Sequence, residues 1–482
     1  IGSFWLKFRF EATEAALALP RRNAPPYSPP MTATSRELGI LAAAFQQLQA
    51  GFDAFPATAT PPDNELSDVL LRLAERLADN DPYHHPLYCG QMLNPPHPVA
   101  RLAYSLAMWL NPNNHALDGG RATSRLEREC VSDIANMIGW DTHLGHLCGG
   151  GTMANFEGLW VSRECSDGGA ILASQQAHYT HQRLSAVLGV PFHSIPINAR
   201  GQMDVDQLES ILQREHVDTV VVTLGTTALG AVDPLADVLE LRQTYPFRVH
   251  VDAAYGGYFT LADNLEAETH RHFGAVAEAD SFAIDPHKHG LQPYGCGCIL
   301  FRDPSVARHY LHDSPYTYYT SEEMHLGEIS LECSRAGAAA AALWATMQHL
   351  PLERGGGFAK GLESGRRAAL GLHGWLDSRK SFHPLLQPEL DIVVWAVEAE
   401  SASASSQRAR QFFEAAQQEQ VYLALATMPR HLVEPLNVIS NWDAPNVTCL
   451  RSTMMKPEHE EWLPEIIERL ERAMLTTFGE RK

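Results

Sequence analysis

The stretch SFAIDPHKHG, residues 281 to 290, holds a single lysine, Lys288, between two histidines. The apolar run SFAI reads as the end of a buried strand, and Pro286 then turns the chain. A lysine at such a strand end is poorly solvated and close to polar groups, so its amine loses a proton more readily than a surface amine does. It can then form an imine with a carbonyl compound. The alternative is a solvated lysine at an ordinary strand end, and this stretch alone favours neither.

Further polar residues follow apolar runs in the same part of the chain. From GGAILASQ near residue 170 to SFAI, short apolar runs alternate with helical patterns. Apolar strands that alternate with helices predict an α/β fold, in which a parallel sheet is covered by helices on both faces. Ligands of such sheets lie at the carboxyl ends of the strands, so the polar residues that end these runs are expected to meet in space. These residues are His178, Thr226, Thr227, Asp252 and Lys288.

A glycine-rich turn precedes this alternation. The sequence CGGGTMANFEGL, residues 148 to 159, places consecutive glycines before a helical pattern. Glycine allows the backbone to approach a ligand closely, and the unpaired amides at the start of a helix attract phosphate. Gly151 and Thr152 are therefore candidates for a phosphate site, although a plain tight turn explains the same residues.

The chain is expected to consist of consecutive segments, one of which holds the alternating strands and helices. Residues 1–34 are expected to be a loosely ordered extension. Residues 35–122 are predicted to be a helical dimerisation segment, because two amphipathic patterns between Ser35 and Ala78 cannot bury both apolar faces alone. Residues 123–350 are predicted to form the large domain that holds the sheet, and residues 351–482 a small α+β domain.

The composition excludes several classes of function. The formal net charge is −20, and no basic cluster follows a path that a phosphate backbone could take, so nucleic acid is not an expected partner. No apolar run reaches the roughly 18 residues of a membrane span, and the N-terminal residues lack the features of a secretory signal. The eight cysteines are scattered as in reduced cytosolic proteins, which predicts a cytoplasmic location. Cys296 and Cys298 lack the second pair of ligands that zinc needs, so no metal is expected.

Five motifs stand in one order along the chain: GGGTMANFEGL, QAHYTHQR, TLGTTALGAVDP, HVDAAYGG and DPHKHGLQPYGCG. With these motifs the sequence from about Tyr88 to the C-terminus resembles the group II pyridoxal-phosphate-dependent amino acid decarboxylases. It is most similar to the tyrosine decarboxylases and the archaeal tyrosine/aspartate type, whereas the animal aromatic enzymes have tryptophan where this chain has His289. The resemblance implies the aspartate-aminotransferase-like fold type I, pyridoxal 5'-phosphate as cofactor, and conversion of an L-amino acid to its amine and carbon dioxide. A homodimer is expected from the two amphipathic patterns between Ser35 and Ala78.

The resemblance also implies a role for each residue type. Lys288 would hold the cofactor as an imine, and Asp252 would keep the ring nitrogen protonated, so that the ring accepts the electrons left by departing carbon dioxide. His178 would stack on one face of the ring and Ala254 on the other. Thr227 would bond near the ring oxygen or the leaving carboxylate. The phosphate contacts would come from Gly151, Thr152 and His287, with a less direct contact from Asp285.

The substrate pocket departs from the aromatic pattern of the resembled family. Where aromatic decarboxylases carry aromatic residues, this chain has Gln91, Met92 and Asn94, which are the expected substrate contacts. The expected substrate is therefore tyrosine, another aromatic amino acid or an acidic one.

A loop tyrosine is expected to protonate the product carbon. The candidates are Tyr316, Tyr318 and Tyr319, and Tyr319 is favoured as the residue furthest into the loop.

Other functions are compatible with parts of this pattern. An aminotransferase on the same fold uses the same lysine and aspartate, and a carbon–carbon lyase is a further alternative. An inactive homologue that serves as a binding scaffold would be expected to lose Lys288 or Asp252, and the chain retains both.

Overall fold

The computed structural model describes residues 34–54, 66–311 and 325–479, and the chain divides into two units, Ile1–Pro82 and Tyr83–Lys482. In the first unit, helices α1 (Ser35–Ala50) and α2 (Leu66–Leu77) confirm the two helices predicted there. A capping box begins α1, because the Thr34 hydroxyl accepts a hydrogen bond from the Glu37 amide and the Glu37 carboxylate accepts one from the Thr34 amide.

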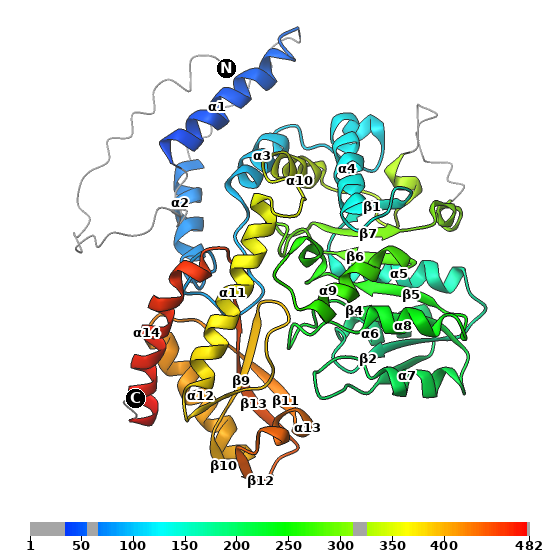
Figure 1. Cartoon of the computed structure of the whole chain (residues 1–482). Coiled ribbons are helices and arrows are strands. Elements are labelled where there is room, and N and C mark those ends of the chain that lie inside the picture. The colour runs from blue at the N-terminus through cyan, green and yellow to red at the C-terminus, as the bar shows by residue number, and fades with distance from the viewer. Residues whose placement is uncertain (1–33, 55–65, 312–324, 480–482) are drawn as a thin grey trace, which may run out of the picture. The chain divides into compact units, whose positions relative to one another are not determined.

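The second unit contains a seven-stranded sheet with the order β1-β7-β6-β5-β4-β2-β3 (Figure 1). The strands from β6 to β3 run parallel, and β7 is antiparallel to both of its neighbours. Every residue of β2, β4, β6 and β7 is buried, which is why these strands read as continuous apolar runs. The predicted α/β fold with a mostly parallel sheet is confirmed. The strands are β1 (Leu144–Cys148), β2 (Ala170–Ser174), β3 (Phe192–Ile195), β4 (Val217–Thr223), β5 (Arg248–Asp252), β6 (Ser281–Ile284) and β7 (Gly297–Phe301).

Helices connect and cover these strands. α5 packs against β5, β6 and β7, and the alanine-rich α10 packs against α3 and α4. The predicted domain limit between residues 122 and 123 falls inside α4, close to a kink at Gly120, and the limits of the large and small domains stay predictions. The helices of this part are α3 (Pro98–Met108), α4 (Leu117–Met137), α5 (Gly151–Glu164), α6 (Thr180–Leu188), α7 (Val205–Leu212), α8 (Leu235–Leu241), α9 (Ala267–Gly274) and α10 (Gly337–His349).

A second sheet lies in the C-terminal part, with four antiparallel strands in the order β11-β13-β9-β8 (Figure 1). α11 and α12 pack on its strands, and α14 packs on both of these helices. This arrangement agrees with the small α+β region predicted from the sequence. Its elements are α11 (Gly357–Asp377), β8 (Phe382–Pro384), β9 (Ile392–Val397), β10 (Ala399–Ser401), α12 (Ala402–Gln418), β11 (Ala424–Pro429), α13 (Arg430–Val433), β12 (Ile439–Asn441), β13 (Asn446–Thr453) and α14 (His459–Phe478).

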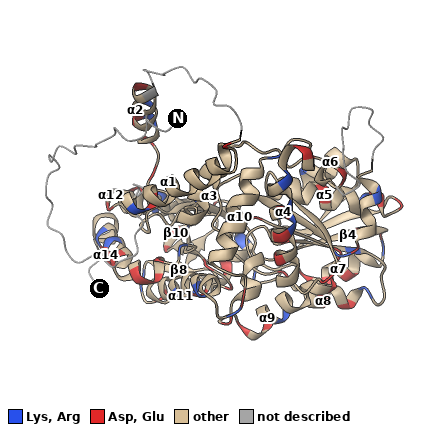
Figure 2. Cartoon of the chain, turned by 90° about the horizontal axis from the view of Figure 1, so that it is seen from above, with Lys and Arg blue, Asp and Glu red and all other residues tan. Residues whose placement is uncertain are grey.

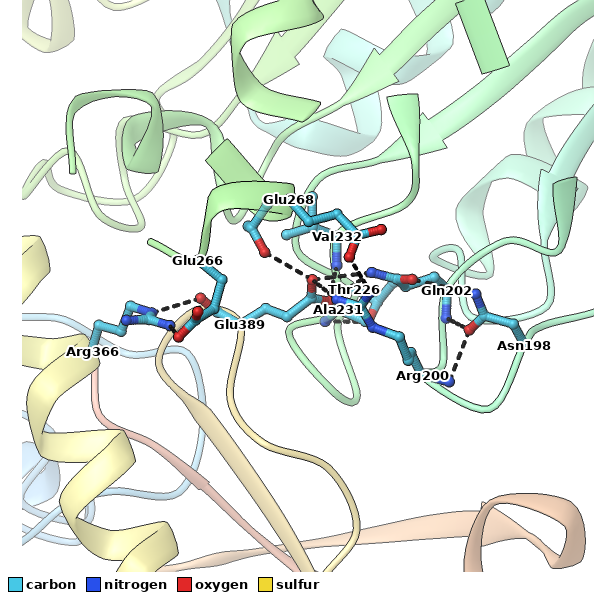
Figure 3. A network of polar contacts seen from close by, with 11 residues as sticks. Asn198, Arg200, Gln202, Thr226, Ala231, Val232, Glu266, Glu268, Arg366 and Glu389 are labelled. Carbon is cyan, nitrogen blue, oxygen red and sulfur yellow. Dashed lines mark hydrogen bonds and ion pairs between the residues drawn. The ribbon is translucent and has the colours of Figure 1, made fainter. Parts of the chain in front are cut away.

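A network of polar contacts around Glu389 joins the segment before β9 to loops of the large sheet (Figure 3). The Glu389 carboxylate accepts hydrogen bonds from the Val232 amide at 2.9 Å, from the Gln202 side-chain amide at 3.0 Å and from the Thr269 hydroxyl at 3.0 Å. Burial raises the pKa of Glu389, and these donors together with Arg200 oppose that rise. The network therefore fixes the loop between β4 and α8 against the small sheet.

Acidic and basic residues are interspersed along the ribbon, without a continuous basic stretch along any labelled helix (Figure 2). This distribution agrees with the excess of acidic residues in the sequence, 57 against 37 basic ones. In the described part of the chain, no helix has both the length and the apolar character of a membrane span.

Candidate active site

The loops that follow β2, β4, β5 and β6 line one cavity of about 660 Å³. Thr226 does not line it, although its position at the end of β4 predicted that it would. Its side chain is buried, and its hydroxyl oxygen accepts a hydrogen bond from the Ala231 amide at 3.1 Å, which holds the turn of that loop. Every residue predicted to bind the cofactor lines the cavity: Gly151, Thr152, His178, Thr227, Asp252, Ala254, Asp285, His287 and Lys288.

The glycine turn before α5 forms part of the cavity wall. Gly150 has a φ of 149°, which residues with side chains rarely adopt. A Cβ atom on Gly151 would lie 2.8 Å from Asp285 Oδ2, so the backbone approaches its surroundings more closely than alanine allows. Gly150 is the N-cap of α5 and offers no side chain to the first amides of the helix, which have no acceptor within the helix. These amides fit a phosphate group.

Asp252, the last residue of β5, is buried and held by two donors. Its Oδ2 atom accepts a hydrogen bond from His181 Nε2 at 2.8 Å, and its Oδ1 atom accepts one from the Ala254 amide at 3.2 Å. Burial alone would raise the pKa of Asp252, but the hydrogen bond from His181, the charge of Lys288 and the Ala254 amide lower it below that of a free carboxyl group. Among the described residues, His181 Nδ1 has no hydrogen-bond partner, so the ring donates through Nε2. A buried carboxylate that stays ionised fits a protonated ring nitrogen of a ligand.

Lys288 has an acidic partner inside the cavity. Its Nζ atom lies 3.0 Å from Asp285 Oδ2, and His287 Nε2 lies 3.6 Å from the same oxygen. His287 donates its Nδ1 hydrogen to the Cys296 carbonyl at 2.8 Å, and burial lowers the pKa of His287. Asp285 is thus the counter-charge of Lys288, whereas its predicted contact with a phosphate group stays a prediction.

His178 is the histidine predicted to stack on a ring. It is partly buried, and its Nδ1 atom lies 2.5 Å from the Thr180 hydroxyl. Burial lowers the pKa of His178, so its imidazole is neutral at neutral pH. A neutral aromatic ring at the cavity wall suits stacking on a planar ligand.

The predicted substrate residues do not line the cavity. Asn94 is buried and donates to the Met455 carbonyl at 3.4 Å, and Gln91 is exposed. Met92 is linked to the cavity only through its backbone, because its carbonyl accepts a hydrogen bond from the cavity-lining Tyr294 at 3.1 Å. The assignment of these residues to substrate binding stays a prediction.

The three candidate loop tyrosines lie outside the described residues. Tyr316, Tyr318 and Tyr319 all belong to the segment 312–324. The choice of Tyr319 as proton donor therefore stays a prediction.

Two residues at the site were not predicted from the sequence. His181 contacts Asp252, and its only sequence signal was its place on the helical stretch that begins beside His178. Arg451, on β13, is buried and donates from Nη2 to the Thr227 carbonyl at 2.8 Å and from Nη1 to the Gly90 carbonyl at 3.3 Å. A single arginine within an apolar strand gave no pattern from which this contact could be derived.

Cys296 and Cys298 are packed as the alternation of a strand predicts. Cys298 lies within β7, Cys296 directly precedes it, and both side chains are buried. Burial raises the pKa of both thiols, so they behave as small apolar side chains.

Known proteins share both the sequence pattern and the fold. Residues 157–397 match the pyridoxal-dependent decarboxylase conserved domain. The chain is 31% identical over 298 residues to a probable L-tyrosine/L-aspartate decarboxylase of Methanothrix thermoacetophila, covering 61% of this chain and 74% of the relative. It is 27% identical over 450 residues to an L-tyrosine decarboxylase of Enterococcus faecium, covering 70% of this chain and 73% of the relative.

Solved structures of low sequence identity have the same fold. The crystal structure of mouse CSAD matches with a TM-score of 0.73 and 20% identity, covering 90% of this chain and 92% of that chain. The structure of Oryza sativa TDC with PLP and tryptamine matches with a TM-score of 0.72 and 18% identity, covering 92% of this chain and 97% of that chain.

The domain match, the relatives and the cavity residues agree with one another. The domain match includes Lys288, Asp252 and His178, which the fold brings to one cavity. The resemblance drawn from the five motifs is confirmed. The chain belongs to the pyridoxal-dependent decarboxylase family, and it is an amino acid decarboxylase that uses pyridoxal phosphate.

Proposed function

We propose that the chain converts an aromatic L-amino acid, tyrosine or a close analogue, to its amine and carbon dioxide. The observation that carries this choice is the apolar lining of the cavity beside Lys288. No arginine of the described residues lines the cavity, and burial lowers the pKa of both His178 and His287, so neither ring offers a positive charge to a second carboxylate at neutral pH. The apolar and aromatic lining residues are Met153, Phe156, Leu184, Val187, Tyr255 and Tyr294.

An acidic substrate is the second candidate. One relative is named a probable L-tyrosine/L-aspartate decarboxylase, and another a probable L-aspartate decarboxylase. The side-chain carboxylate of aspartate would need a cation in the cavity, so we expect aspartate to be the poorer substrate.

The residues that would hold the cofactor line the cavity. Lys288 would bind pyridoxal phosphate covalently through Nζ, and the first amides of α5, at Gly151 and Thr152, would donate hydrogen bonds to its phosphate. Neutral His287 would contact the phosphate without donating to it, because its Nδ1 hydrogen is donated to the Cys296 carbonyl. When bound, pyridoxal phosphate supplies an electron-accepting ring. Asp252 would hold a proton at the ring nitrogen, because its partners keep the carboxylate ionised.

Other cavity residues would orient the reacting groups. His178 and Ala254 would enclose the ring from its two faces, which excludes water from it. Thr227 would orient the leaving carboxylate. The Asp285 carboxylate would pair with the Lys288 ammonium group whenever that amine is free, since the two side chains are 3.0 Å apart. Tyr319 would donate the proton to the substrate carbon.

A panel of amino acids tests this function. The purified protein, loaded with pyridoxal phosphate, is given L-tyrosine, L-phenylalanine, L-aspartate or L-2,4-diaminobutyrate, and carbon dioxide, amine and keto acid are measured. We expect carbon dioxide and amine in equal amounts, fastest from L-tyrosine. Keto acid without carbon dioxide would show an aminotransferase instead, and the absence of all products would favour a binding scaffold.

The same panel applied to Tyr319→Phe tests the proton donor. The variant is expected to make less amine and to gain a slow keto-acid or aldehyde side reaction, with cofactor binding unchanged. Tyr316→Phe and Tyr318→Phe are the matched controls, because they lie within three residues of Tyr319 in the sequence. Amine formation at the parent rate in all three variants would place the acid elsewhere.

We also propose a homodimer with its active sites at the subunit interface. α1 has no buried residue within its own unit, and Val69, Leu70, Leu73 and Leu77 form an exposed apolar face on α2. A second copy of the chain would cover such faces.

Substitution on α2 tests the dimer. The double variant Leu70→Glu/Leu73→Glu is expected to shift the sedimentation profile toward monomer and to lower activity in parallel, because two charges cannot be buried in an apolar interface. Glu75→Ala, on the same helix, should leave both unchanged. A monomeric variant with full activity would contradict the proposed interface.

A cytoplasmic location is the remaining part of the proposal. All eight cysteines are free thiols, and most are buried, as expected for a protein of a reducing compartment. Recovery of the protein from a membrane or secreted fraction of cells would contradict it.

A further inference from the structure

A buried polar cluster links the residue after Lys288 to the small sheet. His289 Nε2 lies 2.8 Å from Asp391 Oδ2, and the Tyr255 hydroxyl donates to Asp391 Oδ1 at 2.6 Å. The three residues are 3%, 1% and 3% exposed for His289, Asp391 and Tyr255. Asp391 directly precedes β9, and Tyr255 lines the cavity. One carboxylate therefore contacts both the neighbour of Lys288 and a wall of the cavity.

Both ring nitrogens of His289 have an oxygen partner. Its Nδ1 atom lies 2.9 Å from the Tyr255 carbonyl oxygen, and its Nε2 atom lies 2.8 Å from Asp391 Oδ2. The ring is therefore held at both ends. Burial raises the pKa of Tyr255 well above its usual value, so the phenol remains a donor to Asp391.

A buried arginine belongs to the same region. Arg451 on β13 donates to backbone carbonyls, and burial lowers the pKa of Arg451 while Asp391 opposes that fall. The Asp391 carbonyl accepts a hydrogen bond from the Met454 amide at 2.8 Å, which fixes the acid between β9 and the end of β13. The Asp391 carboxylate therefore has a fixed position, where the His289 ring and the Tyr255 phenol contact it.

We propose that His289, Asp391 and Tyr255 form a latch that positions Lys288 for covalent attachment of the cofactor and for turnover. The lysine main chain is held on one side, where its amide donates to the Asp285 carbonyl at 2.9 Å. The latch holds the other side, because His289 is the next residue and its ring is bound at both nitrogens. The main chain at Lys288 is therefore held on both sides of the residue. The inference rests on the proposed role of Lys288, and the three members of the latch are positioning residues.

The chain contains a matched pair outside the site. His146 Nε2 lies 2.9 Å from Glu157 Oε2, and its Nδ1 atom lies 2.8 Å from the Leu147 carbonyl oxygen. Both side chains are fully buried, as in the latch, but none of these residues lines the cavity or adjoins Lys288. A substitution in this pair therefore shows how much a buried histidine–carboxylate contact contributes to the stability of the fold, without an effect on Lys288.

The test compares Asp391→Asn, Tyr255→Phe and His146→Gln in the full chain. Pyridoxal phosphate is added to each apo protein at a temperature at which all are folded, and the rate of covalent attachment is followed by visible absorbance. Borohydride then traps the bond for mass measurement. The kcat and KM values are measured with the best amino acid of the panel.

Asp391→Asn is expected to slow attachment and to lower kcat by about 10- to 100-fold, with a smaller change in KM. The reason is that displacing a reacting group by about 1 Å lowers the rate of reaction by up to about 100-fold. Tyr255→Phe removes one hydroxyl and should show a smaller loss of the same kind, and it replaces Asp391→Asn if that variant does not fold. His146→Gln should lower the melting temperature but leave both rates within about twofold of the parent.

The latch is refuted if Asp391→Asn and Tyr255→Phe attach the cofactor at the parent rate, or if His146→Gln slows attachment as much as they do. A failure of the proposed function would give a different experimental result from a failure of the latch. A parent protein that attaches the cofactor but makes no amine from any amino acid would contradict that function, while the attachment rates would still decide whether the latch exists.

Discussion

Asp252→Ala is expected to keep the cofactor attached through Lys288 while kcat falls by about 10³-fold or more, which corresponds to at least about 4 kcal/mol of barrier. The carboxylate is the group that would hold the proton on the ring nitrogen, and without that proton the ring accepts electrons poorly. Attachment at Lys288 should survive, because the Nζ atom has its own partner, Asp285, at 3.0 Å. Steady-state kinetics and the visible absorbance of the bound cofactor measure the two effects separately.

Two further variants show whether the fall in kcat of Asp252→Ala comes from the lost charge or from the lost side-chain volume. Asp252→Asn keeps the shape and removes the charge, so it should resemble Asp252→Ala in kcat. His181→Phe removes the donor that lies 2.8 Å from Asp252 and should cause a smaller loss. Near-parental turnover in Asp252→Ala would contradict the assigned role.

The pH dependence of kcat follows from the same contacts. The pKa of Asp252 is lowered, so its carboxylate stays ionised even at pH values below the usual range of a carboxyl group and is lost only as the pH falls through the lowered value. The parent protein should therefore show no loss from this group between about pH 5 and pH 8. In His181→Phe the pKa should rise, and the acidic limb of the profile should move to higher pH.

Lys288→Ala is expected to abolish covalent attachment and to lower kcat by about 10³-fold or more, because it removes the one amine of the described residues that lines the cavity. The measurement is borohydride reduction in the presence of pyridoxal phosphate, followed by peptide mass mapping. The parent should carry the added mass on the peptide that contains Lys288, and the variant should carry none.

Lys360→Ala is the control for this variant, since Lys360 is exposed on α11 and lies outside the cavity. It should be labelled at Lys288 and should turn over at the parent rate. Added mass at another lysine in Lys288→Ala, together with normal turnover, would show that the attachment site is assigned wrongly.

The order of strands and helices along the chain was enough to place Asp252, Lys288 and the glycine turn at one cavity. Asp252 ends an apolar strand and Lys288 follows another, and parallel strands bring their carboxyl ends to one edge of a sheet. The glycine turn before α5 was recognisable for the same reason, because a local pattern of glycines followed by a helix specifies open backbone amides. Each of these inferences needs only the order of the elements and the period of the apolar residues.

The contacts that these residues make with distant segments of the chain became visible in the folded structure alone. His181 reaches Asp252 across 71 residues of sequence, and Asp391 reaches His289 across 102. The sequence pattern likewise did not indicate that β7 lies antiparallel between β1 and β6. It also did not indicate that Gln91 and Met92 lie outside the cavity lining. Periodicity reports how one segment is buried, whereas these contacts depend on how separate segments pack against one another, which no single stretch of sequence encodes.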